Sequence, residues 1–467
     1  MTPELCTELA CVLRRRGWMM ATAACAQPCM TPVPEDRGAA VGPVPAVRSP
    51  WWWIPSLYYG QGLPYVVVMT LAVVLYKNLG LDNAAIALYT SWLYLPWVIK
   101  PLWSPLVDLL RTKRWWIVTL QLLIGAALAA VALTLPMAGF FQLSLAVFWL
   151  LAFASATHDI AADGFYMLAL PQHEQAAFVG VRSVFYRVAM ISGQGGLVYA
   201  AGRLSESGGD VVRAWQLVFF VLALAFVLLF VWHRMLLPRP ANDLAAAPGQ
   251  ALWQGFTQTF ESFFRRTDIV KVLAFLLLFR LGEAQLVKLF APFLLDPRER
   301  GGLALTTAQV GLVYGTVGVA ALTLGGLLGG WVISRHGLAR WLWAMVVAIH
   351  LPNLLFVALA AWQPQSLVFI TAAVACEQLG YGFGFAAYLM FMILVADGPS
   401  KTAHYALCTG FMALGMMLPG MLSGWLQQQL GYTLFFAWVC LCTLPSVLVA
   451  TRLHIPPDFG RKPGVGP

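Results

Sequence analysis

Long apolar runs constrain the fold of this chain more than any other feature of its sequence. Twelve runs have about the length of a helix that crosses the hydrocarbon core of a bilayer, about 20 residues. Charged residues make up 10% of the chain and hydrophobic residues 60%, which excludes a water-soluble globule. The sequence therefore predicts an all-α membrane protein with twelve transmembrane helices. The runs cover residues 51–76, 84–107, 115–136, 141–170, 176–201, 213–237, 269–295, 305–334, 339–361, 365–395, 402–428 and 430–452.

One long polar segment separates the sixth run from the seventh. Six spans on each side of a linker are typical of a fold built from two repeated halves. We expect a six-helix bundle at 51–237, a cytoplasmic linker at 238–268, a second bundle at 269–453 and a cytoplasmic tail at 454–467. Residues 1–50 are unlike the rest, and we expect a disordered cytoplasmic extension there.

The net charge of +9 is explained by membrane topology rather than by a nucleic-acid partner, because Lys and Arg collect in alternate loops. The loop after the second run holds Asp108 and Arg111, and the loop after the eighth holds Arg335 and Arg340, with Ser334 in place of the acid. We interpret both as gating loops on the cytoplasmic side, although the positive-inside rule alone also places bases there. Both termini are expected to be cytoplasmic.

The eight cysteines include no Cys-x-x-Cys pair. We therefore expect neither a metal site nor a disulfide framework. Nothing in the sequence implies a cofactor.

Charges inside the first six runs are the first candidate site. Charged side chains in a membrane are costly unless they face a cavity or a partner. Asp159 and Asp163 lie one turn apart, and an antiparallel hairpin predicts ion pairs Asp163–Arg182 and Asp159–Arg187. These pairs have two compatible interpretations. They can act as a structural clamp, and one of the aspartates can exchange a proton during transport. Lys100 in the second run joins this polar set.

The second half carries its own charged set. Arg280 and Glu283 lie three residues apart, either as a self-neutralising pair or with Arg280 free to bind an anion. Lys288 lies toward the outside, where it can extend to the membrane surface. Glu377 is a lone acid followed by glycines that alternate with aromatic residues such as Tyr381, a pattern that suits close helix packing or stacking on sugars.

Four segments in matching order resemble the AmpG-like muropeptide permeases, a branch of the major facilitator superfamily. They are the run 94–108 (YLPWVIKPLWSPLVD), the run 155–163 (SATHDIAAD), the run 280–284 (RLGEA), and Glu377 with its glycines. The resemblance extends from about Leu57 to Leu448. It departs from the family's pattern at His158, where an amide is usual, and in the aromatic residues between the glycines.

The resemblance implies a proton-coupled importer of anhydromuropeptides, which are sugar–peptide fragments of the cell wall, in the bacterial inner membrane. It implies proton coupling by Asp159 and Asp163, and it matches Arg280 and Glu283 to a charged pair of the family's seventh span. From the charges and aromatic residues inside the spans, we expect the cargo to be bound by Lys100, Arg280, Glu283, Glu377 and Tyr381. We expect a monomer that works by alternating access. The alternatives are another bulky cargo, such as a siderophore or an acyl-CoA-type anion, and then a lipid scramblase or a membrane-embedded enzyme. No loop carries the clustered nucleophile and base that an enzyme needs.

Overall fold

The structure is a computed structural model that describes residues 49–170, 172–241, 243, 257–258, 260–396 and 401–461. Residues Arg48–Pro467 form one unit, separate from Met1–Val47. The expected N-terminal extension lies outside the described residues, except for its last two positions. Most of the linker and the end of the tail lie outside them too.

The first six runs fall on helices that match the expected spans closely. The second run is divided between two helices, and π-helical segments lie within the first and the fifth. The elements are η1 (Pro50–Trp52), α2 (Ile54–Val66), η2 (Val67–Leu71), α3 (Ala72–Asn78), α4 (Asn83–Trp92), α5 (Leu95–Leu110), α6 (Lys113–Thr134), α7 (Phe140–Ala169), α8 (Gln172–Met190), η3 (Ile191–Leu197), α9 (Val198–Gly208) and α10 (Val211–Leu236).

The last six runs are also helical, and two of them lie in one long element. Helix α19 contains the non-helical Gly431 (φ 70°), which separates the eleventh run from the twelfth. The elements are α12 (Ile269–Leu278), α13 (Leu281–Leu295), η4 (Arg298–Arg300), α14 (Thr307–Val310), η5 (Gly311–Gly318), α15 (Val319–His336), α16 (Leu338–His350), η6 (Leu351–Asn353), α17 (Leu354–Trp362), α18 (Leu367–Ala396), α19 (Lys401–Leu441) and α20 (Leu444–Ala450).

Among the described residues, 8 helical stretches are long and apolar enough to cross a membrane. One of them, His404–Ala450, holds the last two expected spans. The runs 84–107, 176–201 and 269–295 are helical but are more polar or more interrupted, so they fall outside this set. The structure is therefore consistent with twelve spans, three of which have a weaker apolar signal because they carry polar residues or breaks.

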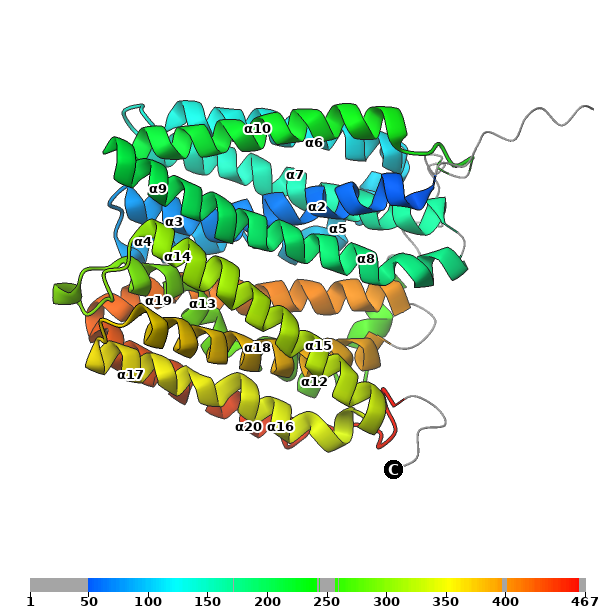
Figure 1. The fold of residues 1–467 in the computed structure, drawn as a ribbon. Coiled ribbons are helices and arrows are strands. Elements are labelled where there is room, and N and C mark those ends of the chain that lie inside the picture. The colour runs from blue at the N-terminus through cyan, green and yellow to red at the C-terminus, as the bar shows by residue number, and fades with distance from the viewer. Residues whose placement is uncertain are drawn as a thin grey trace, which may run out of the picture. The chain divides into compact units, whose positions relative to one another are not determined.

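The two halves of the sequence occupy different parts of the molecule. Figure 1 shows α2 to α10 in the upper part of the view and α12 to α20 in the lower part. The halves touch where α4 and α5 pack on α19, α9 packs on α14, and η3 packs on η5. Helix α5, which carries Lys100, and helix α13, which carries Glu283, therefore lie at this contact.

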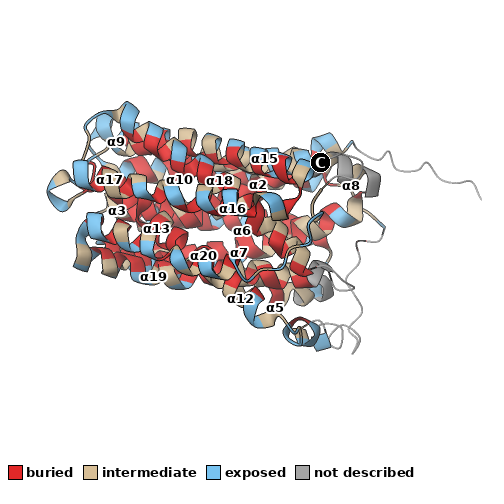
Figure 2. Ribbon diagram, turned by 90° about the horizontal axis from the view of Figure 1, so that it is seen from below, coloured by how far each residue is buried: buried red, intermediate tan, exposed pale blue. Residues whose placement is uncertain are grey.

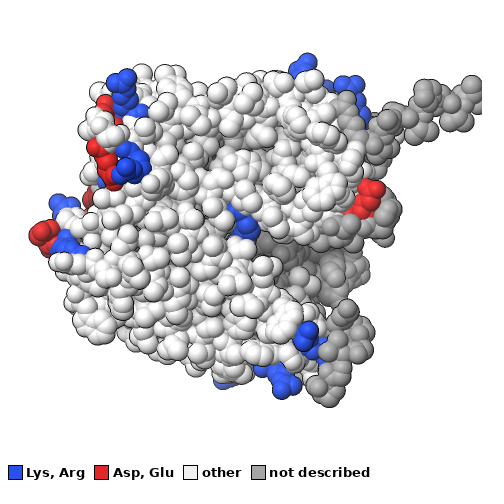
Figure 3. Space-filling model, in the orientation of Figure 1, with Lys and Arg blue, Asp and Glu red and all other residues white. Residues whose placement is uncertain are grey.

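The outer surface of the helices is apolar. Leu224 and Leu228 on α10, Leu327 on α15 and Trp425 on α19 are all exposed, and Figure 2 shows exposed residues along the outside of a buried interior. Figure 3 shows charged groups gathered near the two ends, with a mostly uncharged belt between them. This is the surface that a bilayer solvates.

Candidate functional site

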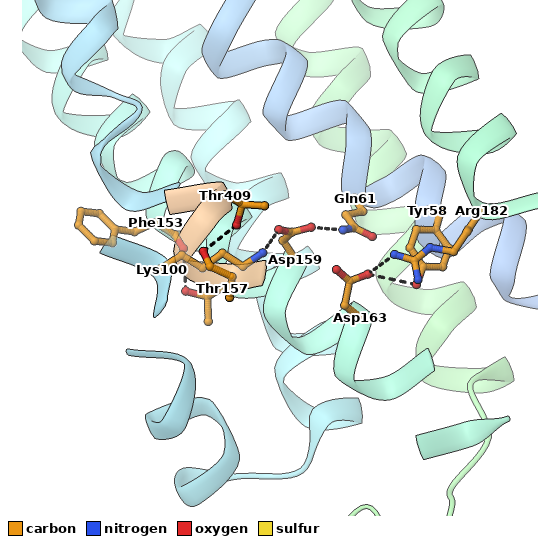
Figure 4. A network of polar contacts seen from close by, with 10 residues as sticks. Tyr58, Gln61, Lys100, Phe153, Thr157, Asp159, Asp163, Arg182 and Thr409 are labelled. Carbon is orange, nitrogen blue, oxygen red and sulfur yellow. Dashed lines mark hydrogen bonds and ion pairs between the residues drawn. The ribbon is translucent and has the colours of Figure 1, made fainter. Parts of the chain in front are cut away.

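An ion-paired network in the first half surrounds the two aspartates of α7 (Figure 4). Asp159 accepts hydrogen bonds from Lys100 of α5 and Gln61 of α2. Asp163 pairs with Arg182 of α8, with 2.6 Å between Oδ1 and Nη2. Three different helices thus supply partners to two carboxylates that lie one turn apart on a fourth.

The predicted Asp163–Arg182 pair is therefore confirmed. The guanidinium of Arg182 also lies over the rings of Tyr58 and Tyr166, at 4.4 and 4.9 Å from their centroids. The hydroxyl of Tyr58 donates to Asp163 Oδ1 at 3.3 Å. Aromatic faces attract the cation and fix its direction toward the carboxylate.

The predicted Asp159–Arg187 pair is wrong. Asp159 pairs with Lys100, and the Arg187 guanidinium instead lies 3.8 Å from the sulfur of Met190. The hairpin argument fails here because it compared only α7 and α8. Lys100 reaches the same carboxylate from α5, which the sequence does not place beside α7.

These four ionic side chains remain partly open to solvent although they lie inside predicted spans. Lys100, Asp159, Asp163 and Arg182 are 21–38% exposed. Figure 3 shows the surface hollowed between the two halves, on the side of α8. We call the end of the molecule where α5 ends and α8 begins the open end. Asp159 and Asp163 lie in the part of α7 that is nearer to this end.

The second half contributes a different arrangement around Arg280, which lies at the break between α12 and α13. Its guanidinium donates to the Tyr381 hydroxyl of α18 and lies 4.8 Å from the centroid of the Phe385 ring. Glu283 is buried, and neither of its carboxylate oxygens has a hydrogen-bond partner among the described residues. Arg280 and Glu283 are both described, and they do not form the self-neutralising ion pair.

Glu377 is the other buried acid of this half. One oxygen accepts from Gln378 at 2.8 Å, and the other has no hydrogen-bond partner in the part of the chain that the structure describes. The glycines that follow it serve helix packing. A Cβ added at Gly382 would lie 2.0 Å from the Leu322 carbonyl of α15, and one at Gly380 would lie 2.2 Å from the Ala348 carbonyl of α16. Tyr381 between them contacts Arg280, so it is placed by this packing.

Opposite the open end, a polar cluster joins the two halves. Lys77 Nζ lies 2.6 Å from Asp296 Oδ1 and donates to Asn83 Oδ1 at 2.7 Å. Asn83 Nδ2 donates to Asp296, Gln427 and Tyr432 at 2.8–3.0 Å, and the Tyr432 hydroxyl donates to Asp296 at 2.6 Å. We call these five residues the latch and this end the closed end. Sequence reasoning missed the latch, because its residues lie at span ends and in loops.

Close backbone contacts reinforce the closed end. A Cβ at Gly315 of η5 would lie 2.0 Å from the Gln194 carbonyl of η3, and one at Gly424 of α19 would lie 2.0 Å from the Asn83 carbonyl of α4. Such approaches need glycine because any side chain would collide with backbone. The two halves are therefore in direct backbone contact at the closed end, whereas the hollow in Figure 3 lies toward the open end.

The predicted gating loops lie at the open end, and the described contacts of Arg111 and Arg335 stay within their own halves. Arg111 lies over the Trp115 ring and Arg335 over the Trp331 ring, each a neighbour on its own half. Arg340 is exposed, and the side chain of Asp108 lies outside the described residues. An acid of the linker, Asp243, lies beside the first of these loops and accepts from the Lys113 and Arg114 amides at the start of α6.

Family comparison agrees with this architecture. The Major Facilitator Superfamily model matches residues 57–397. The anhydromuropeptide permease of Escherichia coli strain K12 is 26% identical over 364 residues, covering 76% of this chain and 69% of that protein. A Rickettsia conorii protein with the provisional name transporter AmpG 4 is 26% identical over 412 residues, covering 84% of this chain and 94% of its own length.

Solved structures show the same fold at low identity. The nucleoside transporter NupG superposes with a TM-score of 0.61 at 16% identity, covering 86% of this chain and 97% of its own. A D-xylose–proton symporter gives 0.63 at 11% identity, covering 88% and 98%. The resemblance to AmpG-like permeases indicated by the motifs is thus confirmed. With its fold, its spans and its family model in agreement, the chain belongs to the Major Facilitator Superfamily and is a multi-pass membrane transporter.

Proposed function

We propose that this transporter imports anhydromuropeptides across the bacterial inner membrane, coupled to protons, by alternating access. The observation that carries the proposal is the pair of ion-bonded aspartates, Asp159 and Asp163, which lie nearer to the open end while the latch holds the other end shut. The named permease of E. coli supplies the cargo class by similarity.

The open end is the cytoplasmic end in this proposal. Arg111, Arg335 and Arg340 lie there, and short loops rich in Lys and Arg stay on the cytoplasmic side. Both termini are then cytoplasmic, the latch faces the periplasm, and the structure is an inward-open state of a monomer.

Proton coupling follows from the ion pairs of α7. A proton on Asp163 removes the negative charge that holds Arg182, and a proton on Asp159 does the same for Lys100. Either event frees a cation of α5 or α8, the helices that border the opening. Because two carboxylates one turn apart repel each other when both are charged, we assign the binding of one proton to this pair.

Most of the residues that we assign to cargo binding lie in the second half. The Arg280 guanidinium can meet a cargo carboxylate, and the Tyr381 and Phe385 rings beside it can pack against sugar. Lys100, Glu283 and Glu377 complete the polar lining that we assign to the cargo. Siderophores and acyl-CoA-type anions are also bulky and polar or anionic. The uptake test must therefore offer an anhydromuropeptide, a siderophore and an acyl-CoA. The relatives' permease and transporter names favour transport over a scramblase or an enzyme.

Uptake into sealed vesicles with an imposed inward proton gradient tests the proposal. Wild-type protein should accumulate labelled anhydromuropeptide, and Asp159→Asn and Asp163→Asn should lose gradient-driven accumulation. Asp82→Asn is a matched control, because Asp82 is exposed at the closed end and asparagine also caps a helix. Accumulation by both α7 variants at the wild-type level would refute the coupling role. Accumulation of a siderophore or an acyl-CoA but no muropeptide would refute the cargo.

A further inference from the structure

Lys288 is a buried cation in the middle of α13 whose partners carry no negative charge. Its side chain is almost fully buried, and Nζ donates to the Thr90 hydroxyl at 3.0 Å. The ammonium also lies 5.1 Å from the centroid of the Tyr94 ring. No carboxylate among the described residues forms an ion pair with it. The sequence-based expectation that Lys288 extends to the membrane surface is therefore wrong.

A charged residue inside a membrane span is expensive unless it has a function or a charged partner. A hydroxyl and an aromatic face stabilise an ammonium less than a carboxylate does. Thr90 and Tyr94 thus leave Lys288 without the counter-ion that such a site favours. The missing counter-ion is the feature that needs an explanation.

Both partners of Lys288 belong to the opposite half of the protein. Thr90 lies on α4 and Tyr94 directly precedes α5, whereas Lys288 lies on α13. From its own half, α19 offers Gly420, where an added Cβ would lie 3.1 Å from Lys288 Cγ, so no side chain fills that space. If the halves separate at the closed end, Thr90 and Tyr94 move away and the ammonium faces the opened path.

We propose that Lys288 binds a carboxylate of the cargo in the outward-open state, and that Thr90 and Tyr94 take the cargo's place in the inward-open state. The inference rests on the proposed import function and deepens it. Lys288 lies eight residues after Arg280, which places the two cations about 12 Å apart along the helix axis at 1.5 Å per residue. A peptide stem that enters from the closed end meets Lys288 first and Arg280 second.

The proposal predicts a change in preference rather than a general loss of transport. In sealed vesicles, initial uptake is compared for a labelled anhydromuropeptide with free stem carboxyls and for the same molecule with those carboxyls amidated. Lys288→Met should lower the acid-to-amide ratio of kcat/KM at least tenfold, and Lys288→Arg should retain it. Thr90→Val removes the hydroxyl that holds Lys288 in the inward-open state and should keep the wild-type ratio.

A purely structural role predicts different results. If Lys288 only ties α13 to α4, Thr90→Val will reproduce Lys288→Met, and that outcome overturns the proposal. An unchanged ratio in Lys288→Met overturns it as well. Should Lys288→Met fail to fold, Lys288→Cys in a background without the natural cysteines provides the test. Aminoethylation of the thiol should restore the preference, and methylation of the thiol should not.

The import function itself is tested by the wild-type protein in the same experiment. If wild-type vesicles take up neither form, the proposed function fails. If they take up the acid in preference and Lys288→Met does so equally, only the role of Lys288 fails.

Discussion

The latch should set how often the closed end opens, and Asp296→Asn should make it open more often. Asp296 is buried, and its carboxylate neutralises Lys77, whose side chain is only 11% exposed. Asparagine keeps an acceptor for Tyr432 but leaves the lysine without a counter-ion while the end is closed. In the opened state Lys77 regains water, so the substitution penalises the closed state selectively.

The size of the effect follows from the burial of the pair. Removing one partner of a fully buried ion pair costs about 3–5 kcal/mol. Lys77 borders a surface cavity of about 450 Å³, so water access reduces this to about 2–3 kcal/mol. At 1.4 kcal/mol per factor of ten, the ratio of closed to open states should fall roughly 30- to 150-fold.

Labelling of a buried cysteine measures this ratio. Ser91 of α4 is fully buried, and a Cβ at Gly420 of α19 would lie 2.8 Å from its hydroxyl. Ser91→Cys, in a background without the 8 natural cysteines, reports opening through its reaction with a membrane-impermeant maleimide. Asp296→Asn should raise the labelling rate by the factor above. Asp82→Asn makes an equal charge change at an exposed position of the same end, and its side-chain oxygen can still accept from Gln428 of the other half, so it should change the rate less than twofold.

A second reporter separates opening from unfolding. Ala161 of α7 is buried within the core of the first half, so Ala161→Cys should stay unlabelled in both variants. Equal labelling of Ser91→Cys in the Asp296→Asn and Asp82→Asn proteins would refute the latch. Labelling of Ala161→Cys would show that the substitution unfolds the bundle instead.

Three further predictions concern packing, capping and the cargo site. Gly382→Ala should lower the melting temperature, because its Cβ meets a backbone carbonyl 2.0 Å away and overpacking costs about 1–3 kcal/mol; Gly330→Ala, with no atom within 4 Å, should leave it equal or higher. Asp243→Ala should cost about 1 kcal/mol by removing the acceptor at the start of α6, measured by thermal unfolding in detergent, with Asp243→Asn costing less. Arg280→Lys should raise KM for the acidic cargo about tenfold, because lysine loses the planar contact with Phe385; an unchanged KM would remove Arg280 from the cargo site.

The fold could be predicted from the sequence because the bilayer imposes it. Twelve apolar runs of span length, with a polar linker after the sixth, leave few alternatives, since only helices satisfy their own backbone in lipid. Contacts within one hairpin could be predicted only in part. Equal distance from the turn between α7 and α8 pairs Asp163 with Arg182 correctly, but the same argument wrongly pairs Asp159 with Arg187.

Contacts between helices that are distant in sequence could not be predicted from the sequence. Lys100 meets Asp159 only because α5 packs beside α7, and no periodicity in either helix encodes that neighbour. The latch joins Lys77 to Asp296 across the two halves for the same reason. Lys288 was wrongly expected to extend to the membrane surface. Its position along the helix gives its depth in the membrane, but not whether its side chain faces the other half. The glycines 311, 315 and 424 were the overlooked signal, since they mark where the halves touch.

Proton movement with the cargo is the central claim, and it can be measured directly. Vesicles loaded with a pH-sensitive dye, with no imposed pH gradient, receive anhydromuropeptide on the outside. The account predicts that the lumen acidifies as the label enters, and that Asp163→Asn abolishes the acidification. Entry of the label into wild-type vesicles without any change of luminal pH would contradict it.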